Sequence, residues 1–276
     1  MIPAGFDYVR AATAEEAIAA LGQHGDDAKI LAGGMSLLPL MKLRLATPAV
    51  LVDVGRVGDL SYVRDAGDHL AIGALTRHRD LETSEVLAEG CGVLRGVAAE
   101  VGDNQVRHRG TLGGSVAHGD PASDLPAVLL ALDATFVATG PSGQREIGAG
   151  EFFRGFLETA LVADELLTEI RVPKTGANDW SYQKFNRRAQ DWAIVGALAV
   201  RVDGATRVAL VNMGSTPLRA RGAEEALAGG ASADDAAARA AEGTEPTSDL
   251  NATAEYREHL ARVLTRRALQ GAGSGA

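Results

Sequence analysis

Several features that mark common protein classes are missing from this sequence of 276 residues. It contains a single cysteine, Cys91, which excludes internal disulfides and any iron–sulfur cluster held by cysteines of this chain. No apolar run reaches the roughly 18 residues of a membrane span. The first ten residues show no basic segment followed by an apolar one, so we expect no signal peptide and a cytoplasmic location.

Positive charge and metal-binding patterns are also scarce. The 27 lysines and arginines are outnumbered by 36 acidic residues, and the net charge of −9 argues against a nucleic-acid partner. The six histidines form no HExxH motif and no paired spacing, so we expect no metal site. No P-loop motif GxxxxGKS/T occurs, and no GxGxxG motif joins a strand to a helix, which removes two common nucleotide-binding loops.

Apolar periodicity predicts an α+β protein. The pattern of residues 1–56 predicts β-α-β-α-β, and residues 57–175 a second α+β unit with hairpins that turn at 66–68 and 140–143. This second unit should also contain a buried helix that begins at Asp124. Two further helices in it are expected over 85–101 and 151–161.

The C-terminal part has a different pattern. After a linker at 174–179, three strands followed by helices predict a separate α+β domain. In the last helix, one apolar stripe should consist of Tyr256, Leu260, Val263, Leu264 and Ala268.

Two Gly-Gly pairs, at 33–34 and 113–114, are notable for their context. Glycine makes up 33 of the 276 residues, so a pair by itself is expected by chance. Each of these pairs precedes a helix-like segment and is closely followed by a serine, Ser36 or Ser115. Such turns expose backbone N–H groups, and two of them together could hold a diphosphate without a lysine. The residues alone leave ordinary tight turns without a ligand equally open.

Both pairs lie in longer segments, AGGMSLLPLMKLR and VRHRGTLGGSVAHGDPASDLPAVLLALDA, and two more segments, KFNRRAQDWAIVGAL and YREHLARVLTRRAL, follow towards the C-terminus. With these segments the chain resembles the FAD-binding (medium) subunits of molybdenum hydroxylases, especially those of aerobic carbon monoxide dehydrogenases. The resemblance implies a vanillyl-alcohol-oxidase (PCMH)-type FAD-binding fold of two α+β subdomains, about 1–56 and 57–175. A carbon monoxide dehydrogenase flavoprotein-type C-terminal α+β domain, 176–276, should follow.

The resemblance also implies an extended FAD between these parts, with backbone N–H groups of both glycine loops on its diphosphate. The residues that match the family's cofactor contacts are Leu31, Ala32, Gly33, Gly34, Met35, Ser36 and Leu37 in the first loop, Thr111, Leu112, Gly113, Gly114 and Ser115 in the second, and Asp124, Leu167, Lys184 and Trp192 beyond them. The hydroxyl of Thr111 can add a further contact.

The resemblance implies a separate role for each of the last four residues. Asp124 should contact the adenosine part, or else only cap a helix. Leu167 should supply an apolar contact. Lys184 should lie near the flavin, where a cation favours the anionic reduced ring, or else be a solvated strand lysine. Trp192 should lie beside the ring, or else in a core. Ser115 stands where relatives often have Asn or Asp, so a side-chain contact there is not expected.

No catalytic or metal-binding residue is implied, because FAD carries the chemistry. The resemblance implies a small subunit with [2Fe–2S] clusters and a large molybdopterin subunit, commonly in a dimer of heterotrimers. Electrons would pass from the clusters to FAD and on to quinone, NAD or another acceptor. A xanthine, aldehyde or heterocycle dehydrogenase subunit, a stand-alone flavin oxidase and a flavin-free scaffold are the alternatives. If the loops are only cofactor contacts, replacing Gly33 or Gly113 by valine should give a folded, cofactor-free protein.

Overall fold

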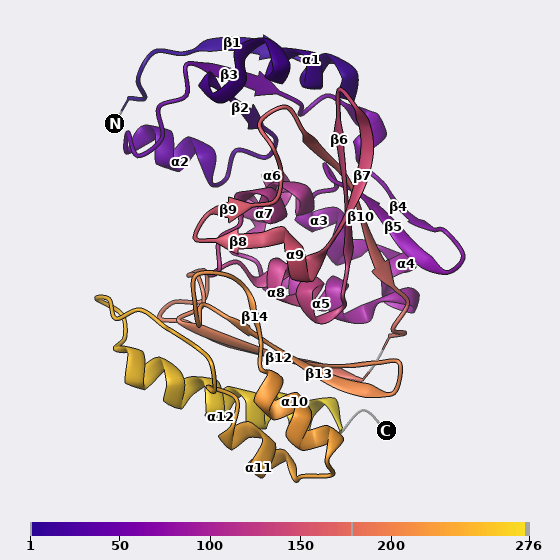
Figure 1. Cartoon of the computed structure of the whole chain (residues 1–276), viewed down its shortest axis with the longest axis vertical. Coiled ribbons are helices and arrows are strands. Elements are labelled where there is room, and N and C mark those ends of the chain that lie inside the picture. Colours follow the sequence, from indigo (N-terminus) through magenta and orange to yellow (C-terminus); the bar gives the residue numbers. More distant parts are fainter. Residues whose placement is uncertain (1, 178, 274–276) are drawn as a thin grey trace.

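Three β-sheets follow one another along the long axis of the molecule (Figure 1). This computed structural model describes residues 2–177 and 179–273. The N-terminal sheet lies at one end, a five-stranded sheet with its helices lies in the middle, and a four-stranded sheet lies at the other end (Figure 1). The predicted α+β class is confirmed.

The N-terminal sheet is parallel, with strand order β1-β3-β2. Helix α1 follows β1 and begins after Thr13, whose hydroxyl accepts the amide hydrogen of Glu16. Parallel strands end at the same edge of a sheet, and the first glycine loop leaves from this edge after β2. The elements are β1 (Asp7–Arg10), α1 (Ala14–His24), η1 (Gly25–Asp27), β2 (Ala28–Leu31), α2 (Leu37–Lys42) and β3 (Val50–Asp53).

The middle sheet is antiparallel, with strand order β4-β5-β10-β6-β7. Both predicted hairpins, β4–β5 and β6–β7, are confirmed. Its strands are β4 (Val63–Asp65), β5 (His69–Gly73), β6 (Thr135–Gly140), β7 (Gly143–Gly148) and β10 (Leu166–Pro173). Its helices are η2 (Gly58–Leu60), α3 (His78–Thr83), α4 (Glu85–Gly90), α5 (Gly92–Ala99), α6 (Asn104–Arg109), α7 (Leu112–His118) and α8 (Asp124–Ala131).

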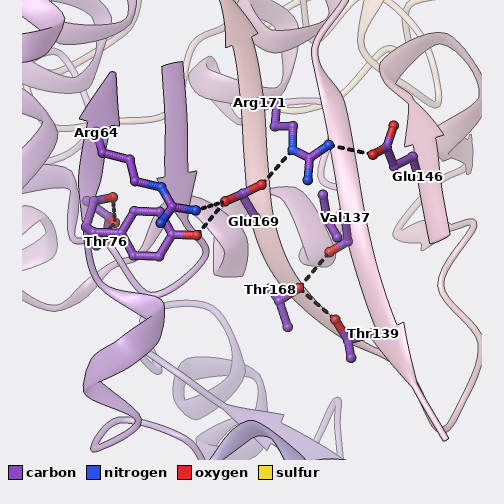
Figure 2. Close-up of polar contacts among 9 residues, drawn as sticks. Arg64, Thr76, Val137, Thr139, Glu146, Thr168, Glu169 and Arg171 are labelled. Atoms are coloured by element: carbon purple, nitrogen blue, oxygen red, sulfur yellow. Dashed lines mark hydrogen bonds and ion pairs between the residues drawn. The ribbon is translucent and has the colours of Figure 1, made fainter. Parts of the chain in front are cut away.

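A polar network links neighbouring strands of the middle sheet around Glu169 (Figure 2). Its carboxylate accepts from the Tyr62 hydroxyl at 2.6 Å, from Arg64 at 3.0 Å and from Arg171 at 2.6 Å, and Arg171 also pairs with Glu146. Burial and the nearby carboxylate raise the pKa of Tyr62 to about 12, so its hydroxyl stays a donor. Glu169 is 8% exposed, whereas Arg64 and Glu146 are largely exposed, so these ion pairs are partly buried.

Helix α8 is buried on every side, and this positions the C-terminal sheet. All of its residues from Asp124 to Ala131 are buried. One side packs on helices α5 and α7 of the middle layer, and the other packs on the C-terminal sheet. A helix that is apolar all round needs partners on both sides, so α8 holds the middle layer and the C-terminal sheet together.

The C-terminal sheet is an antiparallel meander with order β11-β12-β13-β14. Successive residues of β12 alternate between its two faces: Leu198 and Val200 pack towards α8, and Ala197 and Ala199 pack towards the C-terminal helices. The elements are β11 (Trp180–Phe185), β12 (Val195–Val202), β13 (Ala205–Val211), β14 (Leu218–Arg219), α10 (Arg221–Ala228), α11 (Ala233–Ala238) and α12 (Ala254–Ala272).

The predicted helix over 151–161 is wrong. Only α9 (Ala149–Phe152) is helical, and β8 (Phe153–Gly155) and β9 (Glu158–Thr159) form a small hairpin. Phe152 and Phe153 both pack edge-on against Phe136, and Leu157 adopts a left-handed backbone conformation in the turn. A residue with a left-handed backbone does not fit a right-handed α-helix, so the chain turns at Leu157 and does not continue the helix.

The predicted helix over 85–101 is interrupted at Cys91, between α4 and α5. There the Gly92 amide donates to the Gly176 carbonyl, and a side chain at Gly92 would meet the Ala177 carbonyl oxygen at 2.2 Å. The chain beyond β10 therefore packs directly onto this break. Among residues 2–177 and 179–273, no helix is long and apolar enough to cross a membrane.

Candidate cofactor-binding site

One pocket of about 670 Å³ joins the three layers of the molecule. Its size falls in the range of small-molecule and cofactor sites. Both glycine loops line it. It also contacts the end of α1, the segment that leads into β10, and the connection between β11 and β12. The predicted residues that line it are Ala32, Gly33, Gly34, Met35, Ser36, Leu37, Thr111, Gly113, Gly114, Ser115, Asp124, Leu167, Lys184 and Trp192.

Two predicted residues are not brought to this pocket. Leu31 ends β2, where its carbonyl accepts the amide hydrogen of Val54. Leu112 is fully buried in the core of the middle layer, and its amide donates to the Thr76 carbonyl at 2.9 Å. The structure therefore keeps both side chains as packing residues next to the pocket.

The first loop offers free backbone donors. The amide groups from Gly33 to Leu37 have no acceptor among the described residues, and the next amide, that of Leu38, donates to the Gly34 carbonyl. Gly34 has φ +74°, a left-handed conformation that favours glycine. The Ser36 hydroxyl caps nothing. Four of these residues are half-buried and Met35 is exposed, so the amides are not buried groups that lack a partner. Free N–H groups that precede a helix are nevertheless suited to an anionic or acceptor-rich ligand.

The second loop differs, because most of its amides are already bonded. Gly113 donates to the Ala74 carbonyl at 2.8 Å, Gly114 to the Thr111 hydroxyl at 3.1 Å, and Ser115 to the Thr111 carbonyl at 3.0 Å. In this loop only the Thr111 amide has no acceptor among the residues that the structure describes. The sequence-based expectation that both loops donate equally through their backbones is therefore corrected.

Packing within the protein explains why two of the glycines cannot carry a side chain. A Cβ atom at Gly33 would lie 2.2 Å from the Arg109 carbonyl oxygen, and one at Gly113 would lie 2.6 Å from the Ala74 carbonyl oxygen. Both contacts are far below any real Cβ separation, and both neighbours are backbone atoms. The expectation that valine at these positions leaves the fold intact is therefore wrong.

Asp124 and Lys184 form a buried ion pair in the pocket wall. The Lys184 ammonium lies 2.8 Å from the Asp124 carboxylate and 3.0 Å from the Glu100 carbonyl oxygen, and both side chains are 7% exposed. The Tyr182 hydroxyl donates to the same carboxylate at 2.5 Å. Burial, followed by the charge of Asp124, raises the pKa of Tyr182 well above its ordinary value. Lys184 is thus not a solvated lysine.

One expectation about Asp124 is corrected, because Ser123, not Asp124, occupies the N-cap position of α8. Asp124 and Lys184 are in direct contact. The separate assignments of Asp124 to the adenosine and of Lys184 to the flavin stay predictions.

Trp192 and Leu167 occupy opposite extremes of burial. Trp192 is 52% exposed, so it belongs to the pocket rim and not to a core. Leu167 is 4% exposed and lies in β10 behind the pocket.

Some residues that line the pocket were not predicted from the sequence. Lys29, Asp26, Leu161 and Val162 line the end of the pocket at the N-terminal sheet, and Ser123 lies beside Asp124. The sequence predicted a strand at Lys29 and the end of a helix at Leu161, with no role in a site for any of these residues. No pattern along the chain indicated that segments so far apart would meet.

His78 lies deep in the pocket wall and is 4% exposed. Its Nδ1 atom has no hydrogen-bond partner among the described residues. Burial, with a smaller contribution from Arg107, lowers the pKa of His78 from 6.5 to about 4. The imidazole is therefore neutral at physiological pH.

Comparisons with known proteins cover the whole chain. Residues 4–175 match the family described as "FAD binding domain in molybdopterin dehydrogenase", and residues 180–272 match "CO dehydrogenase flavoprotein C-terminal domain". The carbon monoxide dehydrogenase medium chain of Hydrogenophaga pseudoflava is 42% identical over 282 residues, which cover 99% of this chain and 98% of that one.

Two further proteins of known function or structure match over nearly the full chain. Subunit alpha of the 6-hydroxypseudooxynicotine dehydrogenase complex of Paenarthrobacter nicotinovorans is 39% identical, over 98% of this chain and 95% of that one. The structure of the carbon monoxide dehydrogenase of Hydrogenophaga pseudoflava that lacks the Mo-pyranopterin moiety contains a chain that superimposes with a TM-score of 0.94. It covers 100% of both chains at 42% identity.

Replacing Gly113 by alanine should destabilise the protein itself. We expect a loss of about 3 kcal/mol in the free energy of unfolding, because the methyl group would collide with the Ala74 backbone. Urea denaturation without added cofactor measures this loss. Gly148→Ala is the control, since nothing lies within 4 Å of its Cβ position. A Gly113→Ala protein of normal stability would contradict the packing role.

The buried His78 should make stability depend on pH. Between pH 6.5 and about 4 the unfolded chain binds a proton that the folded chain does not. Stability should therefore fall by about 3 kcal/mol as the pH is lowered through this window. In His78→Phe this part of the slope should vanish, whereas in His259→Phe, at an exposed position, it should remain. Urea titrations at several pH values measure it, and an unchanged slope in His78→Phe would refute this assignment.

Proposed function

The chain belongs to the family of FAD-binding subunits of molybdopterin dehydrogenases, and we propose that it transfers electrons through bound FAD as the medium subunit of a carbon monoxide dehydrogenase-like molybdenum hydroxylase. We further propose a PCMH-type FAD-binding domain over 1–175 and a C-terminal domain over 176–276. The break between the two family matches supports this division.

The observation that carries the proposal is the run of unpaired amides from Gly33 to Leu37 in the pocket. Amide hydrogens can bind a diphosphate without a lysine or arginine. The net charge of −9 repels phosphates from the protein as a whole, but the amide hydrogens of this loop attract them locally. The Thr111 amide would complete the diphosphate site from the second loop.

The ion pair indicates where the isoalloxazine ring would lie. A lysine ammonium has three hydrogens, and Lys184 uses two of them on Asp124 and the Glu100 carbonyl, which leaves one for a ligand. The pyrimidine edge of a flavin offers both carbonyl acceptors and an N–H donor, which complement a lysine beside a carboxylate. We therefore assign Asp124, Lys184 and Trp192 to the flavin end, and the adenosine to the end near Lys29 and Val162.

The residues of this chain bind and orient the cofactor. Bound FAD supplies the redox chemistry, because it can take up electrons one at a time and pass them on as a pair. The loop amides would hold its diphosphate, Lys184 would donate to the ring edge, and Trp192 would cover the ring on the solvent side. Tyr182 would hold the Asp124 carboxylate in place, since its raised pKa keeps the hydroxyl a donor.

Partner subunits belong to the same proposal. Cys91 is the single cysteine and is buried, so [2Fe–2S] clusters with cysteine ligands must lie on another chain. We propose a small iron–sulfur subunit and a large molybdopterin subunit in a dimer of heterotrimers, with quinone or NAD as the acceptor. We also propose a cytoplasmic location, which suits a free thiol.

The oxidised substrate would bind to the molybdopterin subunit, so this chain does not identify it. The medium chain of a carbon monoxide dehydrogenase and a subunit of a 6-hydroxypseudooxynicotine dehydrogenase complex are nearly equally similar, at 42% and 39% identity. A dehydrogenase of N-heterocycles or aldehydes is therefore the second candidate.

Ser36→Asp should remove FAD without unfolding the protein. Aspartate is favourable at a helix N-cap, but its carboxylate would compete with the diphosphate for the loop amides. We expect at least about a tenfold loss of FAD affinity, with an unchanged or raised melting temperature of the FAD-free protein. Absorbance at the flavin bands and thermal unfolding measure the two effects. Ser36→Ala keeps the amides and should retain FAD. Normal FAD content in Ser36→Asp would contradict the proposed diphosphate site.

The proposed electron-transfer function can be tested on the complex purified with its partner subunits. We expect molybdenum, iron and FAD to co-purify, and the flavin absorbance to bleach under carbon monoxide without oxygen. Bleaching by an N-heterocycle or an aldehyde instead would assign the complex to the second candidate. A preparation that contains FAD but neither metal would contradict the electron-transfer role in favour of a flavin oxidase.

A further inference from the structure

We infer that Arg257 and Asn212 are positioning residues that fix the Trp192 segment, residues 186–194, against the pocket. The inference concerns contacts within the chain. It rests on the proposed FAD site only for its consequence for FAD binding.

The Trp192 segment connects β11 to β12 and contains no helix or strand. Gln190, Asp191 and Trp192 line the pocket. Since Trp192 is 52% exposed, its own packing cannot fix its position. Near the middle of the segment, Arg188 and Asp191 form an ion pair at 2.8 Å, but both belong to the segment itself. At the end of the segment the Ile194 amide donates to the Phe185 carbonyl at 2.8 Å, and Ala193 and Ile194 are buried. Side chains from two other elements add to this anchoring.

Two side chains bind consecutive carbonyl groups directly after Trp192. The Asn212 amide nitrogen donates to the Ala193 carbonyl at 2.9 Å and to the Ile194 carbonyl at 3.3 Å. The Arg257 guanidinium also donates to the Ile194 carbonyl, at 2.5 Å. These contacts come from the end of β13 and from the first turn of α12, respectively.

Arg257 occupies a position where an apolar residue would be expected. The expected stripe of α12 included Tyr256, but Tyr256 is 44% exposed, and Arg257 is 2% exposed among Leu260, Leu264 and Ala268. Its only carboxylate partner is Asp249, at 2.8 Å, and its Nε atom has no partner among residues 2–177 and 179–273.

A buried arginine on an apolar face contributes little to stability compared with a well-packed apolar residue. Asp249 remains ionised beside it: although burial alone would raise its pKa, the Asn251 and Ala252 amides and Arg257 lower it. The specific effect of the guanidinium is a hydrogen bond that fixes the position of the Ile194 carbonyl.

Asn212 connects the segment to the other side of the pocket. Its backbone amide donates to the Pro121 carbonyl at 2.8 Å, in the turn that leads to Asp124. Its φ of +62° is a left-handed conformation that glycine adopts more easily than asparagine. The backbone geometry therefore does not require asparagine, and its side chain serves the two carbonyls.

The consequence concerns preorganisation. With the carbonyls held, the Trp192 segment is in place before a ligand arrives. Without these bonds, binding must first order the segment and its side chains, which weakens affinity. We therefore expect Arg257→Met and Asn212→Gly to bind FAD about tenfold more weakly than the unchanged protein.

The direct test is the fluorescence of Trp192 in the full-length protein without FAD. The chain has two tryptophans, so the Trp192 signal is the difference from a Trp192→Phe variant. We expect acrylamide quenching of this signal to rise about twofold in Arg257→Met and in Asn212→Gly, because a freed segment exposes the ring more. Arg262→Met is the matched control, since Arg262 pairs only with Glu258 on the exposed side of the same helix.

Asn212→Gly keeps the inference testable if Arg257→Met folds poorly, because glycine retains the backbone conformation and the bond to Pro121. Arg257→Lys retains the charge and should restore part of the protection. Unchanged Trp192 quenching in Asn212→Gly, or equal quenching in Arg257→Met and Arg262→Met, would overturn the inference. If the unchanged protein binds no FAD, the proposed function fails, while the quenching result still decides on the positioning role.

Discussion

Unmet hydrogen bonding in the backbone between Gly33 and Leu37 is the constraint on which the site depends. The fold leaves a consecutive run of amides without an acceptor among the described residues, in a half-buried loop that lines one pocket. The second glycine loop looks similar in sequence, but its amides are already bonded: Gly113 donates to the Ala74 carbonyl, and Gly114 and Ser115 donate to Thr111. The first loop therefore offers free amides to the pocket, whereas the second mainly makes contacts within the protein and lines the same pocket.

Helix α8 is buried between helices of the middle layer and the C-terminal sheet, and its first residue, Asp124, lines the pocket that joins all three layers. Asp124 at the start of α8 accepts hydrogen bonds from Tyr182 and Lys184 of β11, so one carboxylate connects the middle layer to the C-terminal sheet. Asn212 makes a second connection through Pro121, only three residues before Asp124. Residues that line the pocket therefore also make contacts between layers, which links the shape of the pocket to the docking of the C-terminal sheet.

This arrangement suits a protein whose task is to hold a redox cofactor for other subunits. The described residues contain no cluster of three or more side chains that could hold a metal ion. The chemistry that the family performs is divided among chains, and this chain contributes a binding pocket, a lysine at the proposed ring edge and a tryptophan on the rim.

The sequence by itself determined the α+β class, most helices and strands, and the two glycine loops, because capping residues, turn residues and apolar periodicity act over a few neighbouring positions. It also brought most of the pocket residues into view through four family-like segments. It failed at 151–161, where an aromatic cluster formed with distant Phe136 outweighs local helix preference. Only the tertiary structure decided which amides remain free, that Asp124 pairs with Lys184, and that buried Arg257 replaces the expected Tyr256 in the stripe of α12. These outcomes depend on which carbonyls and carboxylates meet in space, and partners that lie 60 or more residues apart, such as Lys184 and Asp124, are not encoded in any local pattern.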